Sequence, residues 1–289
     1  MASDAKLFVG ADGRRVGTVG GGCVEAEVVE QALSVAGPVG VSHTLNSDIA
    51  GDLGLACGGT VDLFLEPVVP EAQTLYASVA SALERRVAGT VRTARTWSAG
   101  PRKEALLGDT TVAVGAGPLG EEAFVESVPR SPRLVLFGAG HVSEAIARVA
   151  AGTDFRVVVV DDRADFANAD RFPDAEVCVE DLRAALDTFV WDRDDYVIAC
   201  TRGHAQDALV VAATAASDAG YVGMLGSRRK QVVIWKALER AGVSQAALRR
   251  VKVPIGEAIG ADTPAEIGVS VMAELIRIRR LVQPEQERP

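Results

Sequence analysis

The sequence predicts a two-domain α/β protein, in which a parallel-sheet domain follows a smaller α+β domain. Two observations carry this prediction. Unbroken apolar runs at 134–137 and 157–160 are separated by a helical pattern, which is typical of parallel strands buried on both faces. In the first half of the chain, short alternating segments separated by turn residues predict strands with one exposed face instead.

The first domain is predicted to span residues 1–128. A hairpin is expected from the strands 7–9 and 15–19, which Asp12-Gly13 joins. A helix should begin near Cys23, because Val24, Val28 and Ala32 recur at helical spacing. Further strands are predicted at 39–45, 61–66, 90–96, 105–107, 110–114 and 122–127, with a helix at 71–87. Pro129-Arg130-Ser131-Pro132 forms the expected linker.

The second domain is predicted to span residues 133–282. Strands are expected at 134–137, 157–160, 196–200 and 221–224, with helices after the first and the last two, and Cys178 falls in a further short strand. Thr263-Pro264-Ala265-Glu266 combines a capping box with proline at the first helical position. It should begin a closing helix that ends near Leu281.

Composition excludes several classes of function. The chain has 289 residues, 48% of them hydrophobic, and a net charge of −9 without a long basic run, which argues against nucleic-acid or membrane partners. No apolar run approaches the roughly 18 residues of a membrane span, and the N-terminus lacks the form of a signal peptide. The four cysteines, at positions 23, 57, 178 and 200, show no zinc or Cys-x-x-Cys spacing. A cytoplasmic protein with reduced thiols and no bound metal is expected.

A glycine–cysteine loop is the first candidate site. Gly20, Gly21 and Gly22 lead directly into Cys23, where uncovered backbone N–H groups and a helix N-terminus favour an anion. They also favour a thiolate at Cys23, although Glu25 and Glu27 oppose it. A second such loop is Cys57-Gly58-Gly59. We expect the two thiols to lie within about 10 Å of each other and to bind a polyanionic or sulfur-bearing ligand. The alternative is that both cysteines are small buried side chains beside tight turns.

The second candidate site is a nucleotide fingerprint. Gly138-x-Gly140 falls between a strand and a helix, and Asp161 ends the next strand about 20 residues on, which predicts a Rossmann-like domain. Ser143 replaces the third glycine, so helix and strand should pack less closely. Asp161 would bind a ribose hydroxyl, whereas Arg163 would suit a 2′-phosphate. A Rossmann scaffold that serves another ligand, or none, is the alternative.

Other candidates follow the carboxyl ends of the predicted strands, where ligands bind in open parallel sheets. They are His141, Asp162, Arg202, His204, Gly226, Ser227 and Arg228. The glycine–serine turn with its cations suits a phosphate, although Arg229 and Lys230 are equally explained as solvated helix charges. No Ser/His/Asp arrangement predicts hydrolysis.

Together these motifs resemble the XdhC/CoxI family, the accessory factors of xanthine dehydrogenase and related molybdenum hydroxylases. The resemblance covers most of the chain. It is carried by the segments 17–25, 57–59, 137–142, 161–163, 201–204, 221–230, 254–256 and 260–267. The start at Lys6-Leu7-Phe8-Val9 is later than in other members, which would indicate a shortened or misassigned beginning.

The resemblance implies a dimeric cytoplasmic carrier rather than an enzyme with turnover. Such a factor binds the molybdenum cofactor, in its mononucleotide or dinucleotide form, while a cysteine desulfurase installs the sulfido ligand. It then delivers the cofactor to the apo molybdenum hydroxylase. The alternatives are an NAD(P)-dependent oxidoreductase that uses Gly138, Gly140 and Asp161, and a nucleotide-sensing regulator.

Overall fold

The computed structural model describes residues 5–45, 59–98, 100–117, 119–120 and 122–281. The chain divides into two compact units, Met1–Arg130 and Ser131–Arg288. Within the described residues, no helix combines the length and the apolar character that crossing a membrane requires.

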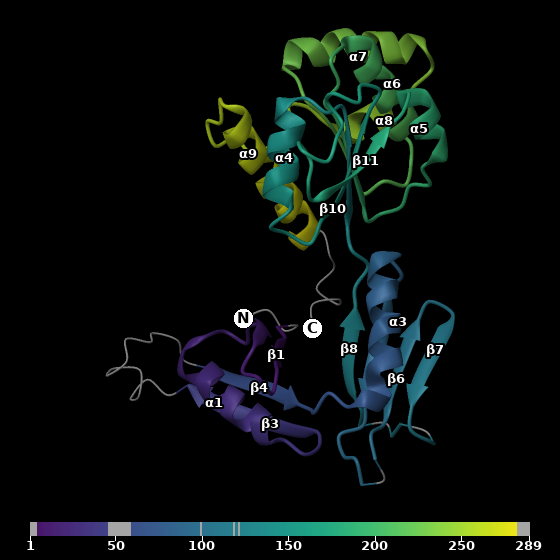
Figure 1. Ribbon diagram of the computed structural model, residues 1–289. Helices are drawn as coiled ribbons and strands as arrows, with labels where there is room; N and C mark the ends of the chain where they lie inside the picture. The colour runs from purple at the N-terminus through teal and green to yellow at the C-terminus, as the bar shows by residue number, and fades with distance from the viewer. Residues whose placement is uncertain (1–4, 46–58, 99, 118, 121, 282–289) are drawn as a thin grey trace. The chain divides into compact units, whose positions relative to one another are not determined.

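The second unit is built on a six-stranded parallel sheet (Figure 1). Its strands are β9 (Arg133–Phe137), β10 (Arg156–Asp161), β11 (Ala175–Val179), β12 (Asp195–Ala199), β13 (Tyr221–Met224) and β14 (Val251–Lys252). Their spatial order is β11-β10-β9-β12-β13-β14, which is the order 3-2-1-4-5-6 of a Rossmann sheet. The strand order reverses between β9 and β12, where Phe137 pairs with Ala199. Ligands bind outside the carboxyl ends of strands at such a switch point.

Helices cover both faces of this sheet (Figure 1). Because successive side chains of a strand point to opposite faces, β9 supplies two cores. Leu134 and Leu136 pack under α4 (His141–Ala150) and α9 (Pro264–Leu281). Val135 and Phe137 pack in the other core. That core is covered by α5 (Leu182–Thr188), α6 (His204–Thr214), α7 (Arg228–Arg240) and α8 (Gln245–Arg250).

The first unit begins with a hairpin and a helix that packs on a second hairpin. Strands β1 (Leu7–Val9) and β2 (Arg15–Gly17) pair antiparallel, as do β3 (Val39–Leu45) and β4 (Gly59–Leu65). Helix α1 (Gly22–Ser34) buries Val28 against Val19 and Leu65, so the apolar stripe that predicts this helix is its packed face.

The rest of the first unit is a four-stranded antiparallel sheet of order β7-β6-β5-β8. Its strands are β5 (Gly89–Thr93), β6 (Lys103–Leu107), β7 (Thr110–Val114) and β8 (Phe124–Val128). They follow a short 3-10 turn, η1 (Pro70–Ala72), and α3 (Gln73–Glu84). The helix buries Leu75 and Ala82 against Val91 and Ala105 of the sheet. Apolar positions on one helix face and one sheet face therefore form this core.

Most predicted elements are confirmed, with four differences, the first being that the strand expected at 90–96 ends at Thr93. The helix expected at 71–87 begins as the 3-10 turn and ends at Glu84, because Arg86 takes a left-handed backbone conformation with φ of 57°. The strand expected at 15–19 ends at Gly17, where φ is 87°. Strand β14 was not predicted, since two residues carry no periodicity. The capping box before α9 is confirmed: the Glu266 N–H donates to Thr263 Oγ1, and Glu266 Oε2 accepts from the Thr263 N–H.

A buried lysine of β6 contacts α3 and the residue that follows β4, within the first unit. Lys103 is 2% exposed, and its ammonium donates to Glu66 Oε1 and, over 2.9 Å, to the Tyr76 hydroxyl. Burial raises the pKa of Tyr76, and the neighbouring Glu66 carboxylate raises it further. The hydroxyl therefore stays protonated and donates to Glu66 over 3.2 Å. Removing either charge would leave the other buried without its partner.

We expect Lys103→Met to lower the free energy of unfolding of the protein by about 3–5 kcal/mol, because the Glu66 carboxylate loses its buried partner. The matched control is Lys6→Met, since Lys6 is mostly exposed and pairs with Glu126 at the surface; it should cost less than about 1 kcal/mol. Urea denaturation followed by circular dichroism measures both. Equal losses in the two variants would contradict the importance assigned to burial.

Candidate functional site

Gly138 brings two loops together at the switch point. Its φ of 110° disfavours any side chain, and a Cβ atom there would lie 2.4 Å from the carbonyl oxygen of Cys200. Only glycine allows the loop after β9 to approach the loop after β12 this closely. The first glycine of the fingerprint is thus required by the protein's own backbone.

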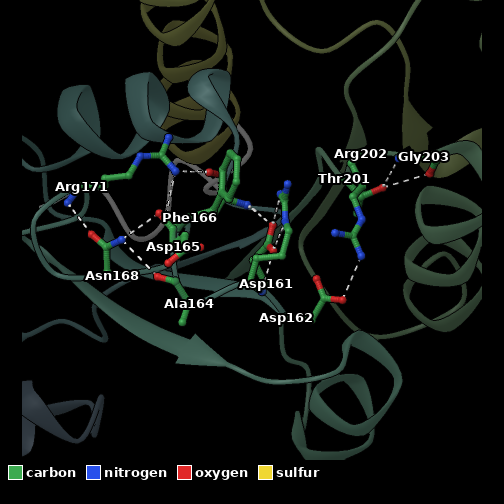
Figure 2. Close-up of polar contacts among 12 residues, drawn as sticks. Asp161, Asp162, Ala164, Asp165, Phe166, Asn168, Arg171, Thr201, Arg202 and Gly203 are labelled. Atoms are coloured by element: carbon green, nitrogen blue, oxygen red, sulfur yellow. Dashed lines mark hydrogen bonds and ion pairs between the residues drawn. The ribbon is translucent and has the colours of Figure 1, made fainter.

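The peptide groups of Ala139 are held from two sides. Its N–H donates to Asp161 Oδ2 over 2.8 Å, and its carbonyl accepts from Arg171 Nη1 over 2.7 Å. Arg171 also donates through Nη2 to Glu144 of α4 over 2.7 Å (Figure 2 shows Asp161 and Arg171). The loop between β9 and α4 is therefore fixed by the segment that follows β10.

Asp161 and Arg163 bind each other. The Asp161 carboxylate accepts from the N–H, Nε and Nη2 of Arg163 and from Ala139, which fills its four lone-pair positions. Burial favours the neutral acid, but these hydrogen bonds outweigh it and lower the pKa of Asp161 to about 2. The Arg163 guanidinium stacks 3.9 Å above the Phe166 ring. Both side chains that the sequence assigns to a nucleotide already have partners within the protein.

Gly140 differs from Gly138 because nothing in the protein requires it. Its φ of −76° suits any residue, and a Cβ atom there would meet no atom within 4 Å. Gly140 is also the N-cap of α4, which has no side-chain cap. Open space beside an uncapped helix N-terminus is the arrangement that admits a phosphate. Gly203, the N-cap of α6 on the neighbouring loop, likewise has open space at its Cβ position.

Several predicted side chains are exposed at this edge of the sheet. His141 and His204 are the exposed first residues of α4 and α6. Arg228 is exposed at the start of α7, as is Arg229. Arg202 is about half exposed and pairs with Asp162 over 3.0 Å (Figure 2). The carboxyl edge of the sheet, where Gly140 also lies, therefore presents exposed cations.

The turn before α7 is tied to the loop after β12. Ser227 caps α7 by accepting from the Lys230 N–H, and Gly226 makes room for the Lys230 side chain. The Lys230 ammonium lies 2.5 Å from buried Asp207, which also accepts from the Thr201 hydroxyl over 2.8 Å. The alternative of a solvated charge is therefore wrong for Lys230, whereas Arg229 is exposed.

Cys200 and Ser143 form a buried contact, with Sγ and Oγ 3.0 Å apart. Burial raises the pKa of the Cys200 thiol to about 12, so this thiol stays protonated and weakly nucleophilic. Ser143 is fully buried at the place of the third fingerprint glycine. Its small side chain fits because it has a polar partner.

In the first unit, the glycine loop before α1 already holds an anion. Gly20, Gly21 and Gly22 all have positive φ. Glu25 Oε2 accepts from the N–H groups of Val19 and Gly21 and from the Thr18 hydroxyl. The bond from Thr18, followed by those from the backbone, lowers the pKa of Glu25. The chain's own carboxylate thus occupies N–H groups that the sequence assigns to a ligand.

The cysteine part of this prediction concerns residues outside the described ranges. Cys57 and Gly58 lie outside them, as does the side chain of Cys23, so the expected approach of the two thiols stays a prediction. Gly59 begins β4, where it pairs with Leu45. Among the described residues, no three His, Cys, Asp or Glu side chains gather as a metal site.

Two family models match the chain. One, described as the XdhC Rossmann domain, matches residues 134–275, and the other, described as the XdhC and CoxI family, matches residues 4–39. The chain belongs to the XdhC/CoxI family. The predicted family and the Rossmann-like fold class are thereby confirmed.

Curated relatives align with nearly the whole chain. The uncharacterized protein YqeB of Escherichia coli K12 is 28% identical over 95% of this chain, which spans only 40% of YqeB. A probable xanthine dehydrogenase component of Bacillus subtilis 168 is 26% identical over 96% of this chain and 88% of its own length. The molybdenum cofactor insertion chaperone PaoD of E. coli K12 is 28% identical over 95% of this chain and 78% of its own length.

A solved structure shares the fold. The crystal structure of a xanthine dehydrogenase from Bacillus halodurans superposes with a TM-score of 0.83, covering 98% of this chain and 88% of that one, at 24% identity. This match supports the arrangement of strands and helices described above.

Sequence reasoning missed the residues that hold the site in place. Arg171 and Glu144 fix the loop after β9, and Asp207 with Lys230 fixes the loop after β12. In the sequence these residues are visible only as charges on predicted helices and loops near the sheet edge. A charge alone does not indicate which residue it will bind. These residues act on the candidate site through the backbone.

We expect Asp161→Asn to lower the free energy of unfolding by about 2 kcal/mol at pH 7. The native pKa of Asp161 is depressed, so its stabilising contribution is full above about pH 4 and disappears as the pH falls through about 2. The difference between the variant and the unsubstituted protein should therefore shrink from pH 5 to pH 2 in urea titrations. Asp187→Asn, an exposed change of the same charge on α5, should show no such trend. A difference that does not vary with pH would contradict this role.

Proposed function

We propose that this chain binds the molybdenum cofactor, holds it while its sulfido ligand is installed, and delivers it to a xanthine dehydrogenase-type hydroxylase. Membership of the XdhC/CoxI family supports the proposal, as does similarity to PaoD, which is named as a molybdenum cofactor insertion chaperone. The cofactor is cargo in this role, so the protein itself needs no catalytic turnover.

The observation that carries the proposal is the open space at Gly140. A phosphate placed there meets an uncapped helix N-terminus on a loop that is already fixed at Ala139. Molybdopterin carries a phosphate, and its dinucleotide form carries a pyrophosphate. Arg202 and Arg228 supply exposed positive charge at the same sheet edge. The residues therefore fit the phosphate part of the cofactor, in either form.

The remaining steps of the proposal concern partners. A cysteine desulfurase would supply sulfur, and the apo-hydroxylase would receive the sulfurated cofactor, with this chain acting as a cytoplasmic homodimer. Cys23 is the second residue of α1 and is the proposed soft contact for molybdenum or its sulfur. Cys57 is its proposed companion.

A second candidate function is NAD(P)-dependent oxidoreduction. The 3-2-1-4-5-6 strand order and the Gly138-x-Gly140 loop favour it. Against it, Asp161 would have to release Arg163 before it could accept a ribose hydroxyl. Steady-state reduction of a nicotinamide nucleotide by a small substrate, without any effect on a hydroxylase, would favour this candidate over a carrier.

We expect Gly140→Asp to weaken binding of the dinucleotide cofactor at least tenfold, since a carboxylate would fill the open space and repel phosphate. Gly37→Asp is the matched control, because a Cβ atom at Gly37 also meets nothing within 4 Å and Gly37 lies in the first unit. Calorimetry measures the affinities, and circular dichroism checks that both variants fold. Undiminished affinity in Gly140→Asp would exclude this edge as the binding site.

Transfer can be tested separately from binding. Added to apo-hydroxylase with cofactor and a sulfur source, the protein should raise the yield of active, sulfurated enzyme. Cys23→Ala should reduce this yield, because the proposed soft contact is lost. Cys178→Ala is the control, since burial raises the pKa of that thiol and β11 places it away from the strand ends of the switch point. An equal yield with both variants would remove Cys23 from the proposal.

A further inference from the structure

The ion pair between Asp162 and Arg202 joins the loops that follow the two strands beside β9. Asp162 follows β10, and Arg202 follows β12. Both strands pair directly with β9, one on each side. A bond between the loops that leave β10 and β12 therefore crosses the end of β9, where the loop of Gly138 and Gly140 begins.

The backbone at both Asp162 and Arg202 is held in place by neighbouring hydrogen bonds. Asp162 lies between Asp161 and Arg163, which bind each other. Arg202 follows Thr201, whose N–H and hydroxyl both donate to buried Asp207 (Figure 2 shows Thr201 and Arg202). The loops are anchored while the two charged side chains remain exposed. The pair can therefore open by side-chain rotation alone.

We propose that Asp162 is the residue that sets the affinity and charge selectivity of this site, by holding Arg202 until a phosphate replaces it. The proposal rests on the function proposed above. The pair is bonded over 3.0 Å, and the side chains of Arg202 and Asp162 are 49% and 37% exposed, so little free energy holds it closed. A phosphate dianion or pyrophosphate at Gly140 offers Arg202 more negative charge than one carboxylate does. A carboxylate ligand gains no such advantage over Asp162, which would make the site selective for phosphate.

The same arrangement assigns different roles to two adjacent aspartates. Asp161 is 4% exposed and fully bonded, so it positions the glycine loop. Asp162 is exposed and bonds Arg202 at the surface, so its bond is the one that a ligand can exchange. The fingerprint acid and the selectivity residue are therefore neighbours in the sequence.

Calorimetry with inorganic pyrophosphate tests the proposal. Asp162→Asn should bind pyrophosphate about two- to fivefold more tightly, because Arg202 no longer has a competing anion. Arg202→Gln should bind about tenfold more weakly. Asp165→Asn removes the same charge from an exposed side chain three residues further on, and its affinity should be unchanged.

A double variant tests whether Asp162 competes with the phosphate for Arg202 or simply repels the phosphate. In the Arg202→Gln background, Asp162→Asn should give no gain if Asp162 acts through Arg202. A gain that persists there, or no gain in the single variant, would overturn the proposal while leaving phosphate binding intact. If neither the unsubstituted protein nor Asp162→Asn binds pyrophosphate, the phosphate site proposed above fails, and this role of Asp162 fails with it.

Discussion

The two hydrogen bonds to Ala139 are the constraint on which the candidate site depends. Asp161 and Arg171 hold this residue from opposite sides, while the close approach of Gly138 to Cys200 fixes the loop against β12. Because the loop is rigid before any ligand arrives, the N-terminus of α4 keeps its direction. A phosphate that binds there does not have to order the loop, which saves conformational entropy on binding.

The loops of both glycine motifs and the loop after β12 are fixed in the same way: a carboxylate of the chain accepts hydrogen bonds from backbone N–H groups. Asp161 does so for Ala139, Asp207 for Thr201, and Glu25 for Val19 and Gly21. Each of these carboxylates therefore has the structural role of holding a loop in place. Charge that remains exposed and exchangeable at the sheet edge, such as that of Arg202, is what a ligand can use.

Much of the fold follows from periodicity and turn chemistry, but the site's supporting contacts do not. The apolar runs of β9 and β10 and the capping box of α9 are local signals, and they place these elements within a few residues. In contrast, the bond from Arg171 to Ala139 joins residues 32 positions apart, which no local pattern specifies. The fingerprint locates Asp161 correctly at the end of β10. It does not indicate that Arg163 and Ala139 fill the carboxylate, because lone-pair occupancy depends on tertiary geometry.

The two glycine loops differ in what they can accept. At both Gly140 and Gly21 the space for a Cβ atom is open and no side chain caps the helix that follows. At Gly21 the N–H is bonded to Glu25, so a phosphate would have to displace a carboxylate attached to the same helix. The loop after β9 in the second unit is therefore the better phosphate acceptor of the two.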